Sequence, residues 1–169
     1  MESPNDNNGP TTSDADVKNV QRIKESLALS NASNSHSNTA PCSSGTDDLS
    51  QKSIPKVKEV SIEEGANKYV LVTGRDENNE EKVFVYSRIS ANYHADVAGP
   101  LTEELSSLNY SNIEVLGGGR ILLDSSLKKL VVYGYSYGFG MADHAVTVGA
   151  IIQTGEYEGY DIEHNNEGY

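Results

Sequence analysis

One histidine in this 169-residue sequence stands where reactive groups are often found. The stretch NYHAD, residues 92–96, places His94 between an apolar run and a predicted helix. An imidazole with a pKa near 6.5 can accept a proton or act as a nucleophile at neutral pH, and such junctions often carry function. A lone histidine is nevertheless more often a hydrogen-bonded packing residue. The residues around His94 therefore leave both roles open.

A second feature is the glycine-rich stretch YGYSYGFGMADH, residues 133–144, which follows a predicted strand and opens a predicted helix. Glycines in this position let backbone N–H groups converge, and a helix N-terminus adds partial positive charge. The stretch could therefore bind an anion such as phosphate. Glycines also occur at strand-to-helix turns that bind no ligand, and this alternative remains open.

Several other chemistries find no support in the sequence. The only cysteine, Cys42, has no arginine six residues later, which excludes a cysteine phosphatase loop and an intrachain disulfide. No Asp-x-Asp-x-Thr or Asp-x-Asp-x-Val pair and no P-loop motif is present. The four histidines are scattered, so no group of residues has metal-ligand spacing. We therefore expect neither a metal ion nor another cofactor.

The composition limits the partners and the compartment. The chain has 25 Asp and Glu against 13 Lys and Arg, a net charge of −12, which argues against nucleic acid as a partner. We find neither an apolar run near 18 residues nor a signal-peptide pattern, which argues against membrane insertion and secretion. These features predict a protein of the cytoplasm or nucleus.

The first 55 residues differ from the rest. They contain no aromatic residue, and 22 of them are Ser, Thr or Asn. Such a segment buries too little apolar surface to offset its conformational entropy, so residues 1–55 are predicted to be a disordered tail. One exception is a short helix after Asp14 and Asp16, which could cap it, with Val17, Val20, Ile23 and Leu27 at roughly helical spacing. Alone, that helix would be marginal in water.

Residues 56–169 have the pattern of one α+β domain. Residues 68–73 and 82–86 read as two strands of a hairpin, rich in β-branched and aromatic residues. Val97, Leu101, Leu105 and Leu108 mark one face of a helix. That helix either begins at Pro100 or begins near His94 with Pro100 in its first turn.

The remaining elements complete the expected fold. Residues 113–116, 120–123, 129–135 and 160–164 are predicted strands, with a tight glycine turn at residues 117–119 between the first two. Residues 143–153 are a second predicted helix, with Ala145, Val148, Ile151 and Ile152 on one face. The prediction is therefore a single domain with a mixed sheet of about six strands flanked by two helices.

Five short motifs occur in an order that resembles one known family. These are NKYVL (67–71), NYHAD (92–96), LGGGR (116–120), VYGYS (132–136) with the following G-x-x-x-H (140–144), and NEGY (166–169). Over about residues 60–169 the chain resembles the small phosphohistidine phosphatase family, also called the janus family. The resemblance implies metal-independent hydrolysis of the P–N bond of phosphohistidine in proteins.

The resemblance also implies site residues. The histidine of the Y-H-A-D motif, here His94, would be catalytic, as a general base or as a nucleophile. Lys68 and Ser136 would bind the phosphoryl group, and so would the backbone N–H of Gly138, where the family commonly has alanine. Arg120 would support the site or the substrate. Some members carry an arginine before the catalytic motif, where this sequence has Tyr86 with Arg88 nearby. Asp96 is expected to cap a helix rather than to take part in chemistry.

Three functions remain compatible with these residues. The first is a protein histidine phosphatase acting on phosphohistidine-containing proteins. The second is a non-catalytic, phosphate-binding regulator with a sex-specific or germline role, which the janus name implies for insect members. The third is a broader phosphoramidase that also acts on phospholysine or small P–N compounds. We expect a monomer, because the sequence contains neither a coiled-coil pattern nor an obvious apolar interface.

Overall fold

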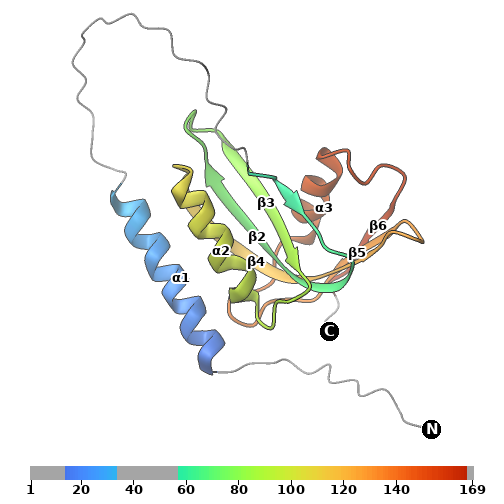
Figure 1. Ribbon diagram of the computed structural model, residues 1–169, viewed down its shortest axis with the longest axis horizontal. Coiled ribbons are helices and arrows are strands. Elements are labelled where there is room, and N and C mark those ends of the chain that lie inside the picture. The colour runs from blue at the N-terminus through green and yellow to red at the C-terminus, as the bar shows by residue number, and fades with distance from the viewer. Residues whose placement is uncertain (1–13, 34–56, 167–169) are drawn as a thin grey trace, which may run out of the picture.

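The computed structural model describes residues 14–33 and 57–166 of the chain. Within these ranges it contains three helices and a six-stranded mixed sheet, an α+β fold (Figure 1). The boundary predicted between tail and domain at residues 55 and 56, Cys42 and most of the NEGY motif lie outside the described residues. The tail-and-domain division therefore stays a prediction.

The sheet has the strand order β1-β3-β2-β4-β5-β6. Its strands are β1 (Val60–Ser61), β2 (Gly65–Arg75), β3 (Glu81–Arg88), β4 (Ser111–Asp124), β5 (Lys129–Tyr133) and β6 (Asp161–His164). The outer pairs β1/β3 and β5/β6 are parallel, and the inner pairs are antiparallel. The expected hairpin of β2 and β3 is present, and β2 lies in the middle of the sheet.

Helices cover both faces of the sheet. Helices α1 (Asp14–Ser33) and α2 (His94–Ser107) pack on one face, and α3 (His144–Gln153) packs on the other (Figure 1). Alternate residues of β2 enter the two cores: Val70 and Val72 face α1 and α2, and Tyr69 and Leu71 face α3. Because β2 is buried on both faces, its sequence is a continuous apolar run rather than an alternating one.

Helix α2 begins at His94, in agreement with one of the two expected starts. Pro100 is the seventh residue of the helix, so it lies beyond the first turn, contrary to that expectation. Val97, Leu101 and Leu105 are buried as predicted. Asp96 accepts a hydrogen bond from the backbone N–H of Tyr93 at 2.8 Å and so stabilises the start of the helix from its third residue.

The glycines at residues 117–119 do not form a turn. They lie inside β4, a single strand from Ser111 to Asp124, with a register irregularity opposite Leu71 and Val72. The prediction of two strands and a tight turn was therefore wrong. A Cβ on Gly118 would lie 2.6 Å from the carbonyl oxygen of Tyr69, and one on Gly119 would lie 2.6 Å from that of Tyr133. The glycines are needed because neighbouring segments approach β4 closely, not because the chain reverses.

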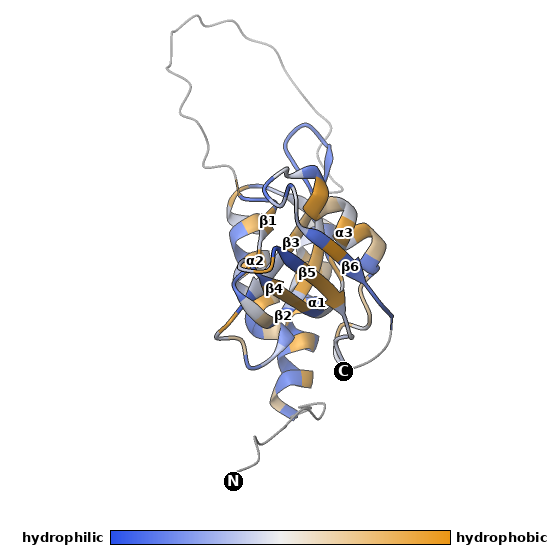
Figure 2. Ribbon diagram, turned by 90° about the vertical axis from the view of Figure 1, so that its right-hand side faces the viewer, coloured by the Kyte–Doolittle hydropathy of each residue, from blue (hydrophilic) through white to orange (hydrophobic). Residues whose placement is uncertain are grey.

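Helix α1 is the exception foreseen in the N-terminal segment. Val20 and Leu27 are buried against α2 and the sheet, whereas Val17 is 47% exposed. In Figure 2, α1 alternates hydrophilic and hydrophobic residues, as expected for a helix with one packed face. The prediction of a disordered tail is therefore wrong for residues 14–33. Tertiary packing stabilises a helix that would be marginal alone.

The buried face of α3 also differs from the prediction. Ile151 is buried and Val148 partly so, but Ala145 and Ile152 are exposed. The polar residues His144 and Thr147 are buried instead, because both lie within hydrogen-bonding distance of the Tyr69 hydroxyl. An apolar pattern alone cannot identify a helix face whose polar groups find buried partners.

Candidate active site

His94 is buried at the junction between the sheet and α2. It is the first residue of α2, and only 4% of it is exposed. Its Nε2 lies 2.9 Å from the carbonyl oxygen of Gly119 in β4. A carbonyl oxygen can only accept, so Nε2 carries the proton and, in the neutral ring, Nδ1 holds the lone pair. The hydrogen bond therefore fixes both the orientation and the tautomer of the imidazole.

The surroundings keep this imidazole neutral. Burial, opposed by the Gly119 hydrogen bond and assisted by the positive charges of Lys68 and Arg120, lowers the pKa of His94 to about 4. At neutral pH His94 is thus an unprotonated base with an available Nδ1. That form can accept a proton from water or attack phosphorus.

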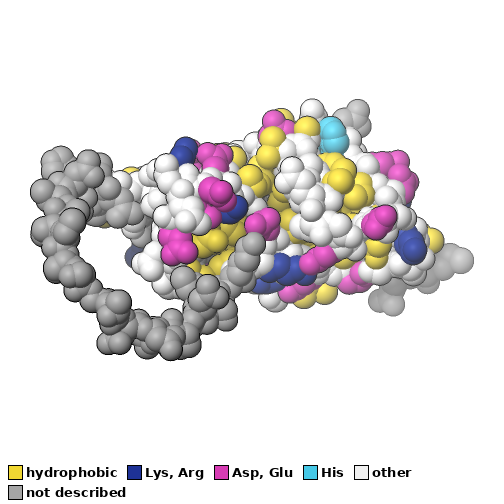
Figure 3. Space-filling model, turned by 90° about the horizontal axis from the view of Figure 1, so that it is seen from above, with side chains coloured by type: hydrophobic (Ala, Val, Ile, Leu, Met, Phe, Trp, Pro, Cys, Tyr) yellow, Lys and Arg dark blue, Asp and Glu magenta, His cyan; other side chains and the backbone are white. Residues whose placement is uncertain are grey.

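Three cationic residues lie side by side across the sheet near His94. In the strand register, Lys68 of β2 lies directly opposite Arg88 of β3 and Arg120 of β4. Residues opposite each other in antiparallel strands project from the same face, and this face is the one covered by α2, since Lys68 alternates with Val70. The chain as a whole is acidic, and Figure 3 shows acidic side chains scattered over the face it presents. The row of cations therefore favours an anionic ligand.

Lys68 and Arg120 are the predicted members of this row. Burial, followed by the charge of Arg120, lowers the pKa of Lys68, while Asp16 and Asp96 act in the opposite direction. Both cations also act on the pKa of His94, so the structure brings these three predicted residues together. A mobile anion that joined them would relieve the repulsion between the two cations.

Arg88 occupies the third place in the row. Its guanidinium lies 3.4 Å from the Glu63 carboxylate, donates a hydrogen bond to Ser61 Oγ at 3.1 Å and lies 5.2 Å from the ring centre of Tyr86. These partners hold it beside the site rather than in it. The sequence analysis assigned no role to Arg88, and the register of β2 and β3 is the signal that locates it.

Ser136 is buried beside His94, but its hydroxyl is engaged within its own loop. Only 1% of Ser136 is exposed, and its Oγ accepts a hydrogen bond from the Phe139 N–H at 3.2 Å. A Cβ built on Gly118 would lie 2.9 Å from His94 Cδ2 and 3.2 Å from Ser136 Cβ. Ser136 and His94 therefore flank the same glycine. Gly140 accepts hydrogen bonds from the N–H groups of Gly118 and Ser136, which ties the loop to β4.

The predicted anion nest is only partly available. The N–H of Phe139 binds Ser136 Oγ, and that of Gly140 binds the Ser136 carbonyl. The N–H of Gly138 makes no hydrogen bond with the part of the chain that the structure describes. The amide of Gly138 can therefore still bind a ligand, in line with what the resemblance implies.

Asp16 is a site neighbour that the sequence did not reveal. It lies in the first turn of α1 and is only 5% exposed. Burial and the charge of Asp96 raise the pKa of its carboxyl, whereas Lys68 and a hydrogen bond from the Ala95 N–H lower it. The sequence suggested Asp16 only as a helix cap. Its neighbours Lys68 and Ala95 lie 52 and 79 residues further along the chain, so no local pattern could have shown them.

The second buried histidine lies on the opposite face of the sheet. His144 Nδ1 lies 2.8 Å from the Tyr69 hydroxyl, and Nε2 lies 3.0 Å from the Gly134 carbonyl oxygen. Asp143 caps α3 by accepting hydrogen bonds from the N–H groups of Ala145 and Val146. The G-x-x-x-H motif thus fixes the start of α3 and does not contribute a side chain to the His94 site.

Two further findings concern the described residues. They contain no group of three or more His, Cys, Asp or Glu residues placed to hold a metal ion. None of the three helices in residues 14–33 and 57–166 is both long and apolar enough to span a bilayer.

The fold and the site define a single α+β domain with a buried, neutral histidine beside cationic side chains. Residues 54–161 match the Janus/Ocnus family (Ocnus), and the chain belongs to this family. This confirms the resemblance found in the sequence.

Curated relatives carry two kinds of name. The chain is 39% identical to the sex-regulated protein janus-A of Drosophila yakuba over 122 residues, 72% of this chain and 88% of the relative. The Drosophila melanogaster protein of the same name is 38% identical over the same shares. A 14 kDa phosphohistidine phosphatase of Sus scrofa is 32% identical over 123 residues, 69% of this chain and 95% of the relative.

Proposed function

We propose that this protein hydrolyses the P–N bond of phosphohistidine in proteins, giving histidine and phosphate. The observation that carries the proposal is the buried His94, neutral at neutral pH, whose Nδ1 is free to react while Nε2 binds Gly119. Lys68 and Arg120 supply positive charge beside it. The relative named as a phosphohistidine phosphatase supports the choice of substrate.

Two routes use the same nitrogen of His94. In the first, Nδ1 takes a proton from water, the water oxygen bonds to phosphorus, and the P–N bond breaks as the leaving imidazole takes a proton from His94 or from solvent. In the second, Nδ1 itself bonds to phosphorus as the P–N bond of the substrate breaks, and the leaving imidazole takes a proton from solvent. Water then cleaves the bond between Nδ1 and phosphorus and releases phosphate from His94. In both routes Lys68, Arg120 and the Gly138 N–H would hold the phosphoryl oxygens, because phosphoryl transfer depends mainly on positioning and charge stabilisation. With this charge supplied by the protein, we propose that no metal ion is needed.

The test is release of phosphate from a phosphohistidine peptide in the presence of EDTA. Wild type is expected to complete many turnovers, and His94→Ala none above background. His164→Ala, which alters an exposed histidine of β6, is the matched control and should retain full activity. Assays belong at neutral to alkaline pH, because protonation of the nitrogen also assists uncatalysed cleavage. Equal turnover by wild type and His94→Ala would overturn the proposal.

A second candidate function is a phosphate-binding regulator without turnover. The names of the more similar relatives favour it, because they refer to sex regulation and to no reaction. In that case wild type would bind the phosphohistidine peptide but release at most one phosphate per protein. A broader phosphoramidase would instead cleave small P–N compounds as fast as the peptide.

The compartment and the oligomeric state also remain proposals. We propose a monomer of the cytoplasm or nucleus that acts on phosphohistidine-containing proteins. The acidic composition and the lack of a coiled-coil pattern support this. Light scattering coupled to size exclusion gives the mass directly, and a value of twice 18.3 kDa would refute the monomer.

A further inference from the structure

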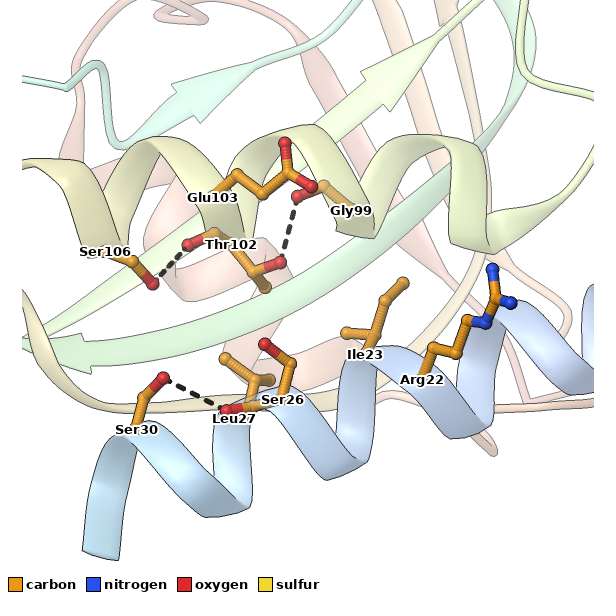
Figure 4. Close-up of a pocket in the computed structure, with 9 residues that line it drawn as sticks. All are labelled: Arg22, Ile23, Ser26, Leu27, Ser30, Gly99, Thr102, Glu103 and Ser106. Atoms are coloured by element: carbon orange, nitrogen blue, oxygen red, sulfur yellow. Dashed lines mark hydrogen bonds between the residues drawn. The ribbon is translucent and has the colours of Figure 1, made fainter. Parts of the chain in front are cut away.

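Helix α1 lies along α2 and reaches the candidate site with its N-terminal end. The two helices run in the same direction, since Asp16 lies near Ala95 and Ile23 lies near Gly99 further along both helices (Figure 1). A groove of about 390 Å³ separates them near the middle of α1, and Figure 4 shows Ile23 pointing across it toward α2. The first turn of α1 is thereby placed at the N-terminus of α2, where His94 lies.

The carboxylate of Asp16 is seated among groups that would attract phosphate. The Ala95 N–H hydrogen-bonds to it at the positive end of α2, and the Lys68 charge acts on it from the sheet. Asp16 is only 5% exposed, which is unusual for an aspartate. A carboxylate and a phosphoryl group both bind to cations and to helix N-termini. The Asp16 carboxylate and a phosphoryl group therefore cannot occupy the N-terminus of α2 at the same time.

The same helix covers Gly138. A Cβ built on Gly138 would lie 2.6 Å from Val20 Cγ2, so α1 packs where a side chain at position 138 would extend. Lys24 donates a hydrogen bond to the Gly138 carbonyl oxygen at 3.1 Å, and its ammonium lies 5.7 Å from the ring centre of Phe139. Helix α1 therefore contacts the glycine loop as well as the start of α2.

We propose that α1 is a built-in competitor of the substrate, with Asp16 occupying the anion subsite that the phosphoryl group needs. The phosphoryl group must displace the first turn of α1 before His94 can act on it. This inference rests on the proposed function for the nature of the substrate, but it concerns occupancy of the site and not turnover. The apparent affinity for phosphate is then the affinity of the undocked form multiplied by the fraction of molecules in which α1 is undocked.

Inorganic phosphate is the probe, titrated calorimetrically into the full chain at constant ionic strength. Asp16→Asn is expected to tighten phosphate binding about tenfold, because it removes a charge-assisted hydrogen bond that holds α1 in place. Asp14→Asn removes the same charge from an exposed position of the same helical turn and should bind like wild type.

Gly138→Ala tests occupancy without changing any charge. The backbone at Gly138 does not have a positive φ, so alanine is permitted there, and the new methyl group collides with Val20. The variant keeps the Gly138 N–H and should also tighten phosphate binding. Gly149→Ala, with nothing within 4 Å of the new Cβ, is its control and should bind like wild type.

Hydrogen exchange gives a readout that simple electrostatics would not move. Phosphate should accelerate exchange of the α1 amides in wild type, since linkage requires the ligand to favour the undocked helix. Equal phosphate affinity in wild type, Asp16→Asn and Gly138→Ala would overturn the inference, and so would α1 exchange that phosphate leaves unchanged. Failure of the proposed function is a different result: no peptide turnover by any variant, whatever the phosphate affinities.

Discussion

A single methyl group added at Gly118 should lower both the stability of the fold and the activity of the site. A Cβ there would lie 2.9 Å from His94 Cδ2, about 0.6 Å closer than an ordinary carbon–carbon contact of about 3.5 Å. It would also lie 2.6 Å from the Tyr69 carbonyl oxygen, which belongs to the neighbouring strand and cannot move without disturbing the sheet. Gly118→Ala must therefore displace the imidazole, the strand or both.

The expected cost follows from these contacts. Overpacking of this kind costs about 1–3 kcal/mol of unfolding free energy. A shift of the imidazole by part of an ångström should lower kcat/KM by about tenfold to a hundredfold. Gly149→Ala is the matched control, because it introduces the same methyl group inside α3 with no neighbour within 4 Å. It should stabilise the protein by about 0.5–1 kcal/mol, since alanine favours a helix over glycine.

Urea unfolding followed by circular dichroism gives the free energies of unfolding. Kinetics with the phosphohistidine peptide, measured under conditions in which both variants are folded, give the rates. The NMR signals of the His94 ring provide a second readout that does not depend on turnover. If Gly118→Ala matched wild type in stability, in rate and in the His94 signals, the close approach of His94 to β4 would be refuted. Equal losses in Gly149→Ala would show that the effect is not specific to the site.

Three further predictions follow from the same geometry. Proton NMR should give His94 a pKa of about 4, below the unfolded value near 6.5. Burial of the neutral ring therefore contributes about 3 kcal/mol to the free energy of unfolding above pH 6.5, and this contribution is lost as the pH falls through 4. A pKa above 6 would contradict the described burial of His94. Lys68→Met should lower kcat/KM for the phosphohistidine peptide about tenfold or more in steady-state assays. The unfolding free energy should stay the same or rise, because burial and the charge of Arg120 already disfavour the charged form of Lys68. A clear loss of stability would count against this prediction. Tyr69→Phe should cost about 1–3 kcal/mol in urea unfolding by leaving His144 Nδ1 without its partner, yet leave kcat/KM unchanged because His94 lies on the other face; a large loss of rate would contradict that separation.

Local patterns in the sequence were sufficient for much of the fold. The hairpin of β2 and β3 follows from two apolar runs around a polar turn, and the start of α2 near His94 was one of two stated possibilities. These features depend on interactions between residues close in the chain. The family motifs then placed His94, Lys68 and Arg120, which the register of the sheet brings together.

The errors arose where distant segments decide the structure. Three consecutive glycines resemble a turn, but Gly118 and Gly119 are required because Tyr69, Tyr133 and His94 approach β4 from other elements. Helix α1 has too little apolar surface to be stable alone, and only the core beside α2 stabilises it. No pattern within residues 14–33 indicates that partner.

The two buried histidines differ in how many of their ring nitrogens are already bound. His144 uses both ring nitrogens, with Tyr69 on Nδ1 and Gly134 on Nε2, so the neutral ring has no nitrogen left for a substrate. His94 uses Nε2 alone, and within the described residues Nδ1 makes no hydrogen bond. Burial makes both rings neutral, but neutrality is useful for reaction only when a lone pair remains available. The number of ring nitrogens already bound therefore separates the two histidines, and it is the reason that we propose His94 as the reactive one.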